Sequence, residues 1–190
     1  MATYNIYLAR LENIALNDKQ QTQVQTLTKG FFDRVINSAR TLRSRFDEGA
    51  RVRWTTSCPT SRIRSHELLV YIVQSVSSSV VSNHYPNVTP GTNGVTAWTT
   101  GAGGTTGSEV YVGRMNPALT ARVIFHETMH NKTHWNDLRL HSRGGLASAT
   151  VMENTRLTDR NIQDMARVLG NNRPQWTGGC VLFNDPLRGL

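Results

Sequence analysis

The chain has 190 residues, 38% of them hydrophobic, which is enough for a single domain over residues 1–190 with a core of its own. No apolar run approaches the roughly 18 residues of a membrane-spanning helix, and two distant cysteines exclude a cysteine-rich scaffold or a CxxC metal site. The formal net charge of +8, from 18 arginines and three lysines against 13 acidic residues, favours acidic partners such as nucleic acid, anionic envelope polymers or acidic proteins.

The first part of the chain predicts one long helix among three strands. Residues 3–12 and 50–56 alternate polar and apolar side chains, as half-buried strands do. Between them, Asn17 can cap a helix that runs to about residue 43. Residues 67–76 form a nearly continuous apolar, β-branched run, which predicts a central strand.

A long loop is predicted for residues 77–108, which are rich in Ser, Thr, Gly and Pro. A loop of this length is unusual in a compact domain unless it serves a function. Residues 108–113 then predict a short strand directly before a further helix. The last predicted helix covers residues 158–169, because Thr158 can cap it and Gly170 can end it.

The helix that follows Asn116 carries the main chemical signal. Asn116 is a good N-cap and Pro117 suits the first helical position, so the HExxH sequence of residues 126–130 falls well inside the helix. Residues four apart lie on one face, so the imidazoles of His126 and His130 can share one zinc ion. Glu127 beside them can act as general base for a water molecule on the metal.

The third metal ligand must come from beyond the helix. His134 lies about 12 Å along a straight helix from His126 and points roughly 80° away from it, so His134 fits only if the helix ends early. We expect the helix to end near Asn136, a candidate C-terminal cap, and His141 to return to the metal. The order of preference is His141 first, then Glu153 and Asp137, and last His134.

The two cysteines and the N-terminus leave alternatives open. Cys58 and Cys180 can form one disulfide in an oxidising compartment or remain two separate thiols. The N-terminal residues lack a basic leader followed by an apolar block, so we expect no Sec signal. Either the protein stays inside the cell, or a leader is absent from this sequence, or export follows a non-classical route.

Four features together resemble the zincin metallopeptidases, and among them the metzincin-like group. They are the HExxH sequence, the short strand from Glu109 to Val112, a histidine beyond the helix, and the closing helix, all within residues 108–170. The resemblance implies an α+β fold with a mixed twisted sheet, an active-site helix and a C-terminal helix. It also implies that the Glu109–Val112 strand is an edge strand that binds peptide substrate, and that a methionine, here Met152, lies beneath the zinc.

The sequence departs from the full metzincin signature, HExxHxxGxxH, at two positions. Thr133 replaces the glycine, and Asn136 stands where the third histidine would be. Ten residues separate His130 from His141. Spartan-like DNA-linked proteases also combine HExxH with a distant third histidine, and the basic charge suits them, but their spacing is longer.

The activity that this resemblance implies is zinc-dependent peptide-bond hydrolysis, with Glu127 as the base. Protein or envelope peptides are the expected substrates, and a self-contained bacterial toxin or effector domain is the expected setting. Candidate donors to the oxyanion are Tyr111, Tyr85, His134 or an arginine. The rival interpretations are a structural zinc held by four histidines (His126, His130, His134 and His141), or a basic binding module without metal.

Overall fold

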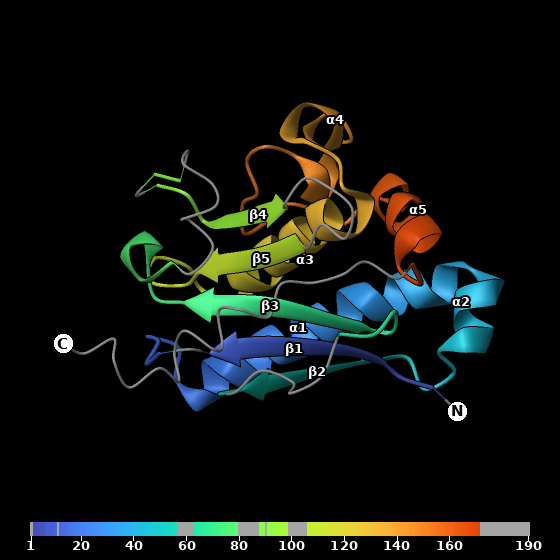
Figure 1. Ribbon diagram of the computed structural model, residues 1–190, viewed down its shortest axis with the longest axis horizontal. Coiled ribbons are helices and arrows are strands. Elements are labelled where there is room, and N and C mark those ends of the chain that lie inside the picture. The colour runs from blue at the N-terminus through green and yellow to red at the C-terminus, as the bar shows by residue number, and fades with distance from the viewer. Residues whose placement is uncertain are drawn as a thin grey trace.

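The computed structural model describes residues 2–10, 12–56, 63–79, 88–89, 91–98 and 106–171. In this part of the chain, five strands form one mixed sheet in the order β2-β1-β3-β5-β4, accompanied by five α-helices (Figure 1). The expected α+β class is therefore observed. Three residues named above lie outside the described residues: Cys58 and Cys180, which could form a disulfide, and Tyr85, a candidate donor to the oxyanion.

The sheet is parallel except at one edge. Strand β1 (Tyr4–Arg10) pairs in parallel with β2 (Ala50–Thr55) and with β3 (Glu67–Val73), and β3 is the central strand, as predicted for this apolar run. Strand β5 (Thr106–Tyr111) continues in parallel beside β3. Strand β4 (Gly94–Trp98) runs antiparallel to β5 and is the last described strand on that side.

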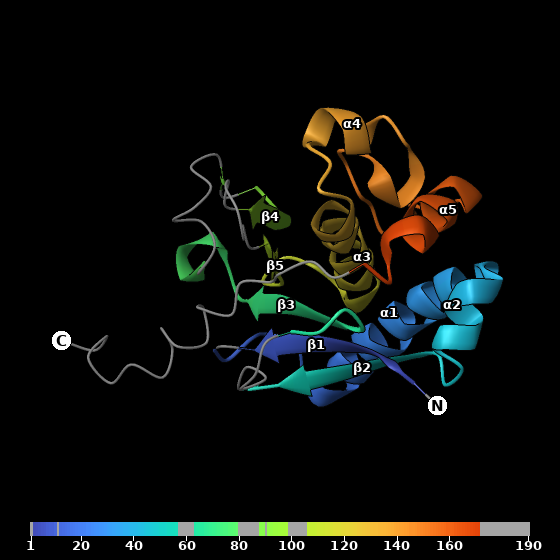
Figure 2. The same cartoon turned by 45° about the vertical axis from the view of Figure 1, so that its right-hand side comes forward.

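Two long helices cover one face of this sheet. Helix α1 (Asp18–Ser38) and helix α3 (Pro117–Thr133) pack against each other and against the strands, and α5 (Asp159–Val168) packs against both helices (Figures 1 and 2). Edge-to-face contact between Phe32 of α1 and Phe125 of α3, with ring centroids 5.4 Å apart, joins the helices. Phe125 is fully buried, so the residue before His126 fixes that turn of α3 in the core.

Helix α1 ends earlier than predicted. The chain extends at Ala39, and a short second helix, α2 (Arg40–Arg45), follows. No proline or glycine lies at this break, but the Ser38 hydroxyl donates to the Val35 carbonyl at 2.7 Å and so takes a backbone acceptor from the last turn. The predicted strand over residues 67–76 ends at Val73, and Val76–Ser78 form a 3₁₀ helix instead.

The prediction that Glu109–Val112 forms an edge strand is wrong. Residues 109–111 of this segment belong to β5 and Val112 follows it; β5 is internal because β3 pairs with one side of it and β4 with the other. Strand β4 lies within the segment predicted to be a loop, and among the described strands β4 lies at this edge of the sheet. Its sequence, Gly-Val-Thr-Ala-Trp, resembles the surrounding Thr- and Gly-rich residues too closely to stand out.

Helix α5 fixes the chain that returns after α3. Asp164 is 1% exposed and accepts two hydrogen bonds from the Arg143 guanidinium, at 2.6 and 2.7 Å. Asn161 donates to the Gly144 carbonyl and accepts from the Leu146 amide, each at 2.9 Å. These bonds fix the segment that contains α4 (Asp137–His141) and the 3₁₀ helix η3 (Gly145–Ala147).

In the described part of the chain, no helix is long and apolar enough to cross a membrane.

Replacing Asp164 tests the role of α5. We expect Asp164→Ala to lower the free energy of unfolding by about 1.5–3 kcal/mol, because it removes a buried carboxylate that accepts two hydrogen bonds from a charged donor. Arg167→Ala is the matched control: Arg167 also approaches Asp164, at 3.6 Å, but its side chain is 73% exposed. That variant should lose less than about 1 kcal/mol in urea unfolding. Equal losses in the two variants would contradict this role for the Arg143–Asp164 pair.

Candidate metal centre

The local sequence of α3 explains where this helix begins and ends. The Asn116 side chain accepts from the Leu119 amide at 2.9 Å, and Pro117 occupies the first turn. The helix ends at Thr133, because His134 adopts the left-handed conformation with φ 53° and ψ 30°. Asn136 does not cap the end of α3. Its side chain caps the start of α4, where it accepts from the Arg139 amide.

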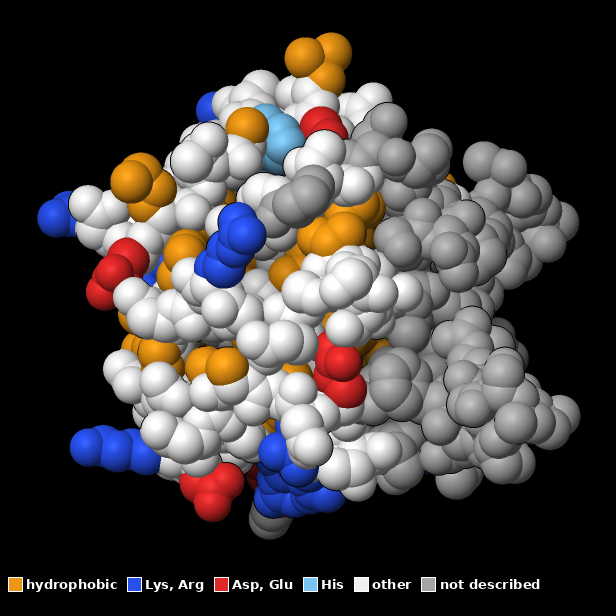
Figure 3. All heavy atoms as spheres, turned by 90° about the vertical axis from the view of Figure 1, so that its left-hand side faces the viewer, with side chains coloured by type: hydrophobic (Ala, Val, Ile, Leu, Met, Phe, Trp, Pro, Cys, Tyr) orange, Lys and Arg blue, Asp and Glu red, His pale blue; other side chains and the backbone are white. Residues whose placement is uncertain are grey.

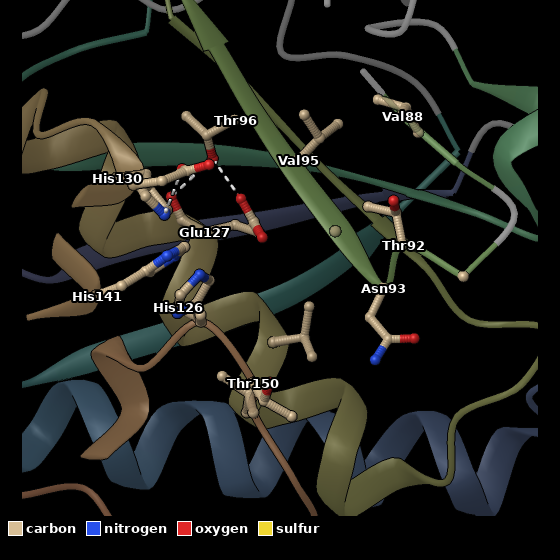
Figure 4. A pocket seen from close by; sticks show the side chains of 16 residues that line it. Val88, Thr92, Asn93, Val95, Thr96, His126, Glu127, His130, His141 and Thr150 are labelled. Atoms are coloured by element: carbon tan, nitrogen blue, oxygen red, sulfur yellow. Dashed lines mark hydrogen bonds and ion pairs between the residues drawn. The ribbon is translucent and has the colours of Figure 1, made fainter. Parts of the chain in front are cut away.

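Three imidazoles converge on one point between α3 and α4. One ring nitrogen from each of His126, His130 and His141 lies within 4.8 Å of the other two, close enough to hold a metal ion. His126 and His130 come from successive turns of α3, and His141 is the last residue of α4 (Figure 4). Of the third-ligand candidates, His141 is therefore the one that joins the α3 pair.

Backbone carbonyls fix which nitrogen of the two α3 histidines faces the centre. The Nδ1 of His126 lies 2.8 Å from the Leu146 carbonyl, and the Nδ1 of His130 lies 2.9 Å from the Trp135 carbonyl. A carbonyl only accepts, so each Nδ1 carries the proton and each Nε2 keeps a lone pair. The Nε2 of His141 is buried without a hydrogen-bond partner. Three nitrogens in this state fit a bound metal ion.

Burial also keeps the α3 imidazoles neutral, as metal ligation requires. Desolvation, together with the charge of His130, lowers the pKa of His126 to about 3. Desolvation likewise lowers the pKa of His130, opposed by its bond to the Trp135 carbonyl and by Asp137.

Glu127 lies at the same centre but is held by the sheet. Its Oε2 accepts from the Thr96 hydroxyl of β4 at 2.8 Å (Figure 4). Burial raises the pKa of Glu127 to about 8, and the Thr96 hydrogen bond opposes that rise. Gly94 lies against the carboxylate: a Cβ at this position would be 2.7 Å from Oε1 and 2.8 Å from Cγ.

The centre opens into a cleft of about 490 Å³. Its described walls come from the segment before and along β4, from α3 and α4, and from Ala149–Val151. Figure 3 views the molecule from the left of Figure 1 and shows a histidine side chain beside an acidic one at the surface. On the described part of that face, the basic side chains are scattered and do not form one patch.

The lower-ranked ligand candidates lie outside the three-histidine cluster. His134 Nε2 lies 2.8 Å from the Thr106 hydroxyl, and its ring stacks on Trp98. Asp137 approaches His130 Nε2 at 3.7 Å, but its side chain is 65% exposed. Glu153 is exposed.

One other expectation for the site is wrong. Met152 is 59% exposed, so it does not lie beneath the centre, whereas the buried Leu146 of η3 contacts His126 through its carbonyl. Tyr111, a candidate donor to the oxyanion, is not among the described residues that line the cleft, and its hydroxyl bonds to Ser79.

Sequence reasoning missed four contributors to the site: Thr96, Gly94, and the Leu146 and Trp135 carbonyls. Residue type does not show which backbone carbonyls accept a hydrogen bond from a side chain. Thr96 and Gly94 reach Glu127 only because β4 joins the sheet beside α3, which the sequence does not show. Their one possible clue was the length of the Gly- and Thr-rich segment before β5, which is typical of a functional loop.

Comparisons of the chain with protein-family models, curated proteins and solved structures found no match. The interpretation of the site therefore rests on its geometry and chemistry.

Metal binding distinguishes His141 from His134. We expect His141→Ala to weaken zinc binding at least tenfold, because it removes one of three converging nitrogens, whereas His134→Ala should change the zinc Kd by less than about threefold. Competition with a chromophoric chelator measures both values. A larger loss in His134→Ala than in His141→Ala would overturn the assignment.

The pH dependence of stability in the metal-free protein tests the neutral state of His126. Between the ordinary histidine pKa of 6.5 and the folded value of about 3, the unfolded chain binds a proton at residue 126 that the folded chain does not. The contribution of His126 to the free energy of unfolding should therefore fall as the pH decreases below 6.5, whereas the raised pKa of Glu127 contributes in the opposite direction. Urea unfolding of the chelator-treated wild-type protein and of His126→Gln at pH 7.5, 6 and 5 separates the two contributions, and the stability of the variant relative to the wild-type protein should rise as the pH falls. An unchanged slope in that variant would contradict the assignment.

Proposed function

We propose that this protein is a zinc-dependent peptide-bond hydrolase of the zincin type. The observation that carries the proposal is the position of Glu127. Its buried carboxylate lines the same cleft as His126, His130 and His141, and lies next in sequence to one of these histidines. A structural metal site needs no such carboxylate, whereas hydrolysis needs a base beside the attacking water.

Zinc suits the donor set better than other common metals. Three neutral imidazoles with an open position are typical of catalytic zinc, and structural zinc has four protein ligands. The described cluster supplies three, and the nearest further candidate, Asp137, is largely exposed. A zinc ion held here would supply a Lewis acid that polarises the substrate carbonyl and lowers the pKa of water.

Glu127 is placed to move the proton. Thr96 occupies Oε2, so Oε1 faces the cleft and can accept a proton from the attacking water. The proton can then pass from Glu127 to the leaving amine, which completes the cleavage. Burial raises the pKa of Glu127, and a carboxylate with a raised pKa is a stronger base.

Strand β4 supplies the surface for an extended peptide. It is the last described strand of the sheet, and Gly94, Val95 and Thr96 line the cleft beside Glu127. A peptide that adds to this edge would place a backbone carbonyl near the three imidazoles. A protein or an envelope peptide is the substrate that this surface suits, in keeping with a bacterial toxin or effector domain.

Replacing Glu127 separates a hydrolase from a structural zinc protein. Glu127→Gln keeps the side-chain size and leaves the three imidazoles in place, so zinc content should stay at one ion per chain. Cleavage of a broad peptide library should fall about 10²–10⁴-fold, as expected on losing a positioned base. Glu153→Gln, on an exposed residue, is the control and should cleave normally. Cleavage by Glu127→Gln at the wild-type rate would contradict the hydrolase proposal.

A further inference from the structure

We propose that Thr96 is a positioning residue that links peptide binding at the edge of β4, which no described strand covers, to the orientation of Glu127. The backbone of Thr96 faces the peptide, and its hydroxyl holds the base. This inference rests on the proposed hydrolase function and adds a residue to its machinery. Thr96 acts through Glu127 and is not itself a catalytic residue.

The hydrogen-bond register of β4 shows which backbone groups are available. The Tyr111 amide donates to the Asn93 carbonyl at 2.9 Å, so these two residues form a hydrogen-bonded pair of the antiparallel ladder. Such pairs alternate along a ladder, so Val95 and Ala97 also direct their amides and carbonyls towards β5. Gly94, Thr96 and Trp98 direct theirs the other way, to the edge beyond which no described strand lies.

The side chain of Thr96 takes a different direction from its peptide groups. It is buried and points from the sheet towards α3, where its hydroxyl lies 2.8 Å from Glu127 Oε2 and 2.9 Å from the Glu127 carbonyl (Figure 4). A hydroxyl has one proton to donate. The bond to the carboxylate is the stronger of the two, because its acceptor is charged when Glu127 is ready to act as a base.

A chain of buried hydrogen bonds leads to the Thr96 hydroxyl. The Asn131 amide, one turn after Glu127 on α3, donates to the Ser108 hydroxyl of β5 at 3.1 Å. The Ser108 and Thr96 hydroxyls are 2.9 Å apart. When Ser108 donates to Thr96, the Thr96 proton is left for Glu127, where the carboxylate Oε2 is the stronger of the two acceptors, and each bond strengthens the next. The chain leaves Oε1 as the acceptor for water.

Gly94 shows how closely the edge strand approaches the base. A methyl group at this position would overlap Glu127 Oε1 and Cγ and the Val123 side chain, each at less than 3.0 Å. Residues 94 and 96 of β4 therefore both touch Glu127 on one side and offer backbone groups to the cleft on another. A peptide paired with this edge would hold the strand, and the strand in turn would hold the carboxylate.

The experiment compares Thr96→Val with Thr96→Ser in the full-length, zinc-loaded protein. Valine keeps the shape and the backbone groups but removes the hydroxyl, whereas serine keeps the hydroxyl. Thr28→Val is the matched control, because Thr28 is buried on α1, far along the chain from the centre, and its hydroxyl has no partner. Zinc content, kcat and KM on a cleaved peptide, and crystal structures of the wild-type protein and both Thr96 variants, are the readouts.

We expect Thr96→Val to bind one zinc ion, to keep its KM and to lose about 10- to 100-fold in kcat, because the base is misplaced while the peptide still binds. Thr96→Ser should recover kcat to within about threefold, and Thr28→Val should match the wild-type protein. An unchanged kcat in Thr96→Val, or a raised KM with normal kcat, would overturn the inference.

The crystal structures decide the inference independently of activity. If the wild-type protein cleaves no peptide, the proposed function fails, and the position of Glu127 still tests the hydrogen bond. A carboxylate displaced in Thr96→Val and in place in Thr96→Ser supports positioning by the hydroxyl. A carboxylate that stays in place in Thr96→Val overturns it.

Discussion

The site depends on the reversal of the chain at His134. A straight continuation of α3 would carry the following residues away from His126 and His130, so no third imidazole could return within so few residues. The left-handed conformation at His134 makes the return possible, although it is unfavourable for a residue with a Cβ atom. Stacking on Trp98 and a hydrogen bond to Thr106 hold His134 in this conformation. His134, the lowest-ranked ligand candidate, thus contributes to the site through its backbone conformation.

Two parts of the fold complete the centre around α3: the chain held by α5, and strand β4. Helix α5 fixes the returning chain through Asn161 and Asp164, and this chain contributes His141 and the Leu146 carbonyl. Strand β4 contributes the opposite side, where Thr96 holds Glu127 and Trp98 supports the end of α3. His126 and Glu127 are therefore positioned by different parts of the fold, although they are neighbours on one helix.

Features that depend on local chemistry were predictable from the sequence. Asn116, Pro117 and the HExxH spacing predicted α3, and Thr158 predicted the start of α5. Helix geometry also ranked His141 above His134 correctly for proximity to the pair. Features that depend on pairing between distant residues were missed. The edge strand was assigned to β5 instead of β4, because the periodicity of a strand does not show its order in the sheet. Met152 was expected beneath the metal, although it is exposed, because a loop sequence does not show which side chains face the core.

The sequence separations within the centre differ in a way that bears on folding. The three histidines fall within one short stretch, so bringing their nitrogens together closes only a small loop and costs little chain entropy. The bond between Thr96 and Glu127 spans 31 residues and requires β4, β5 and α3 to be assembled. A partly folded chain can thus gather its three imidazoles before the sheet edge is complete. During folding, the chain would then become able to bind a metal ion first, and Glu127 would be oriented afterwards.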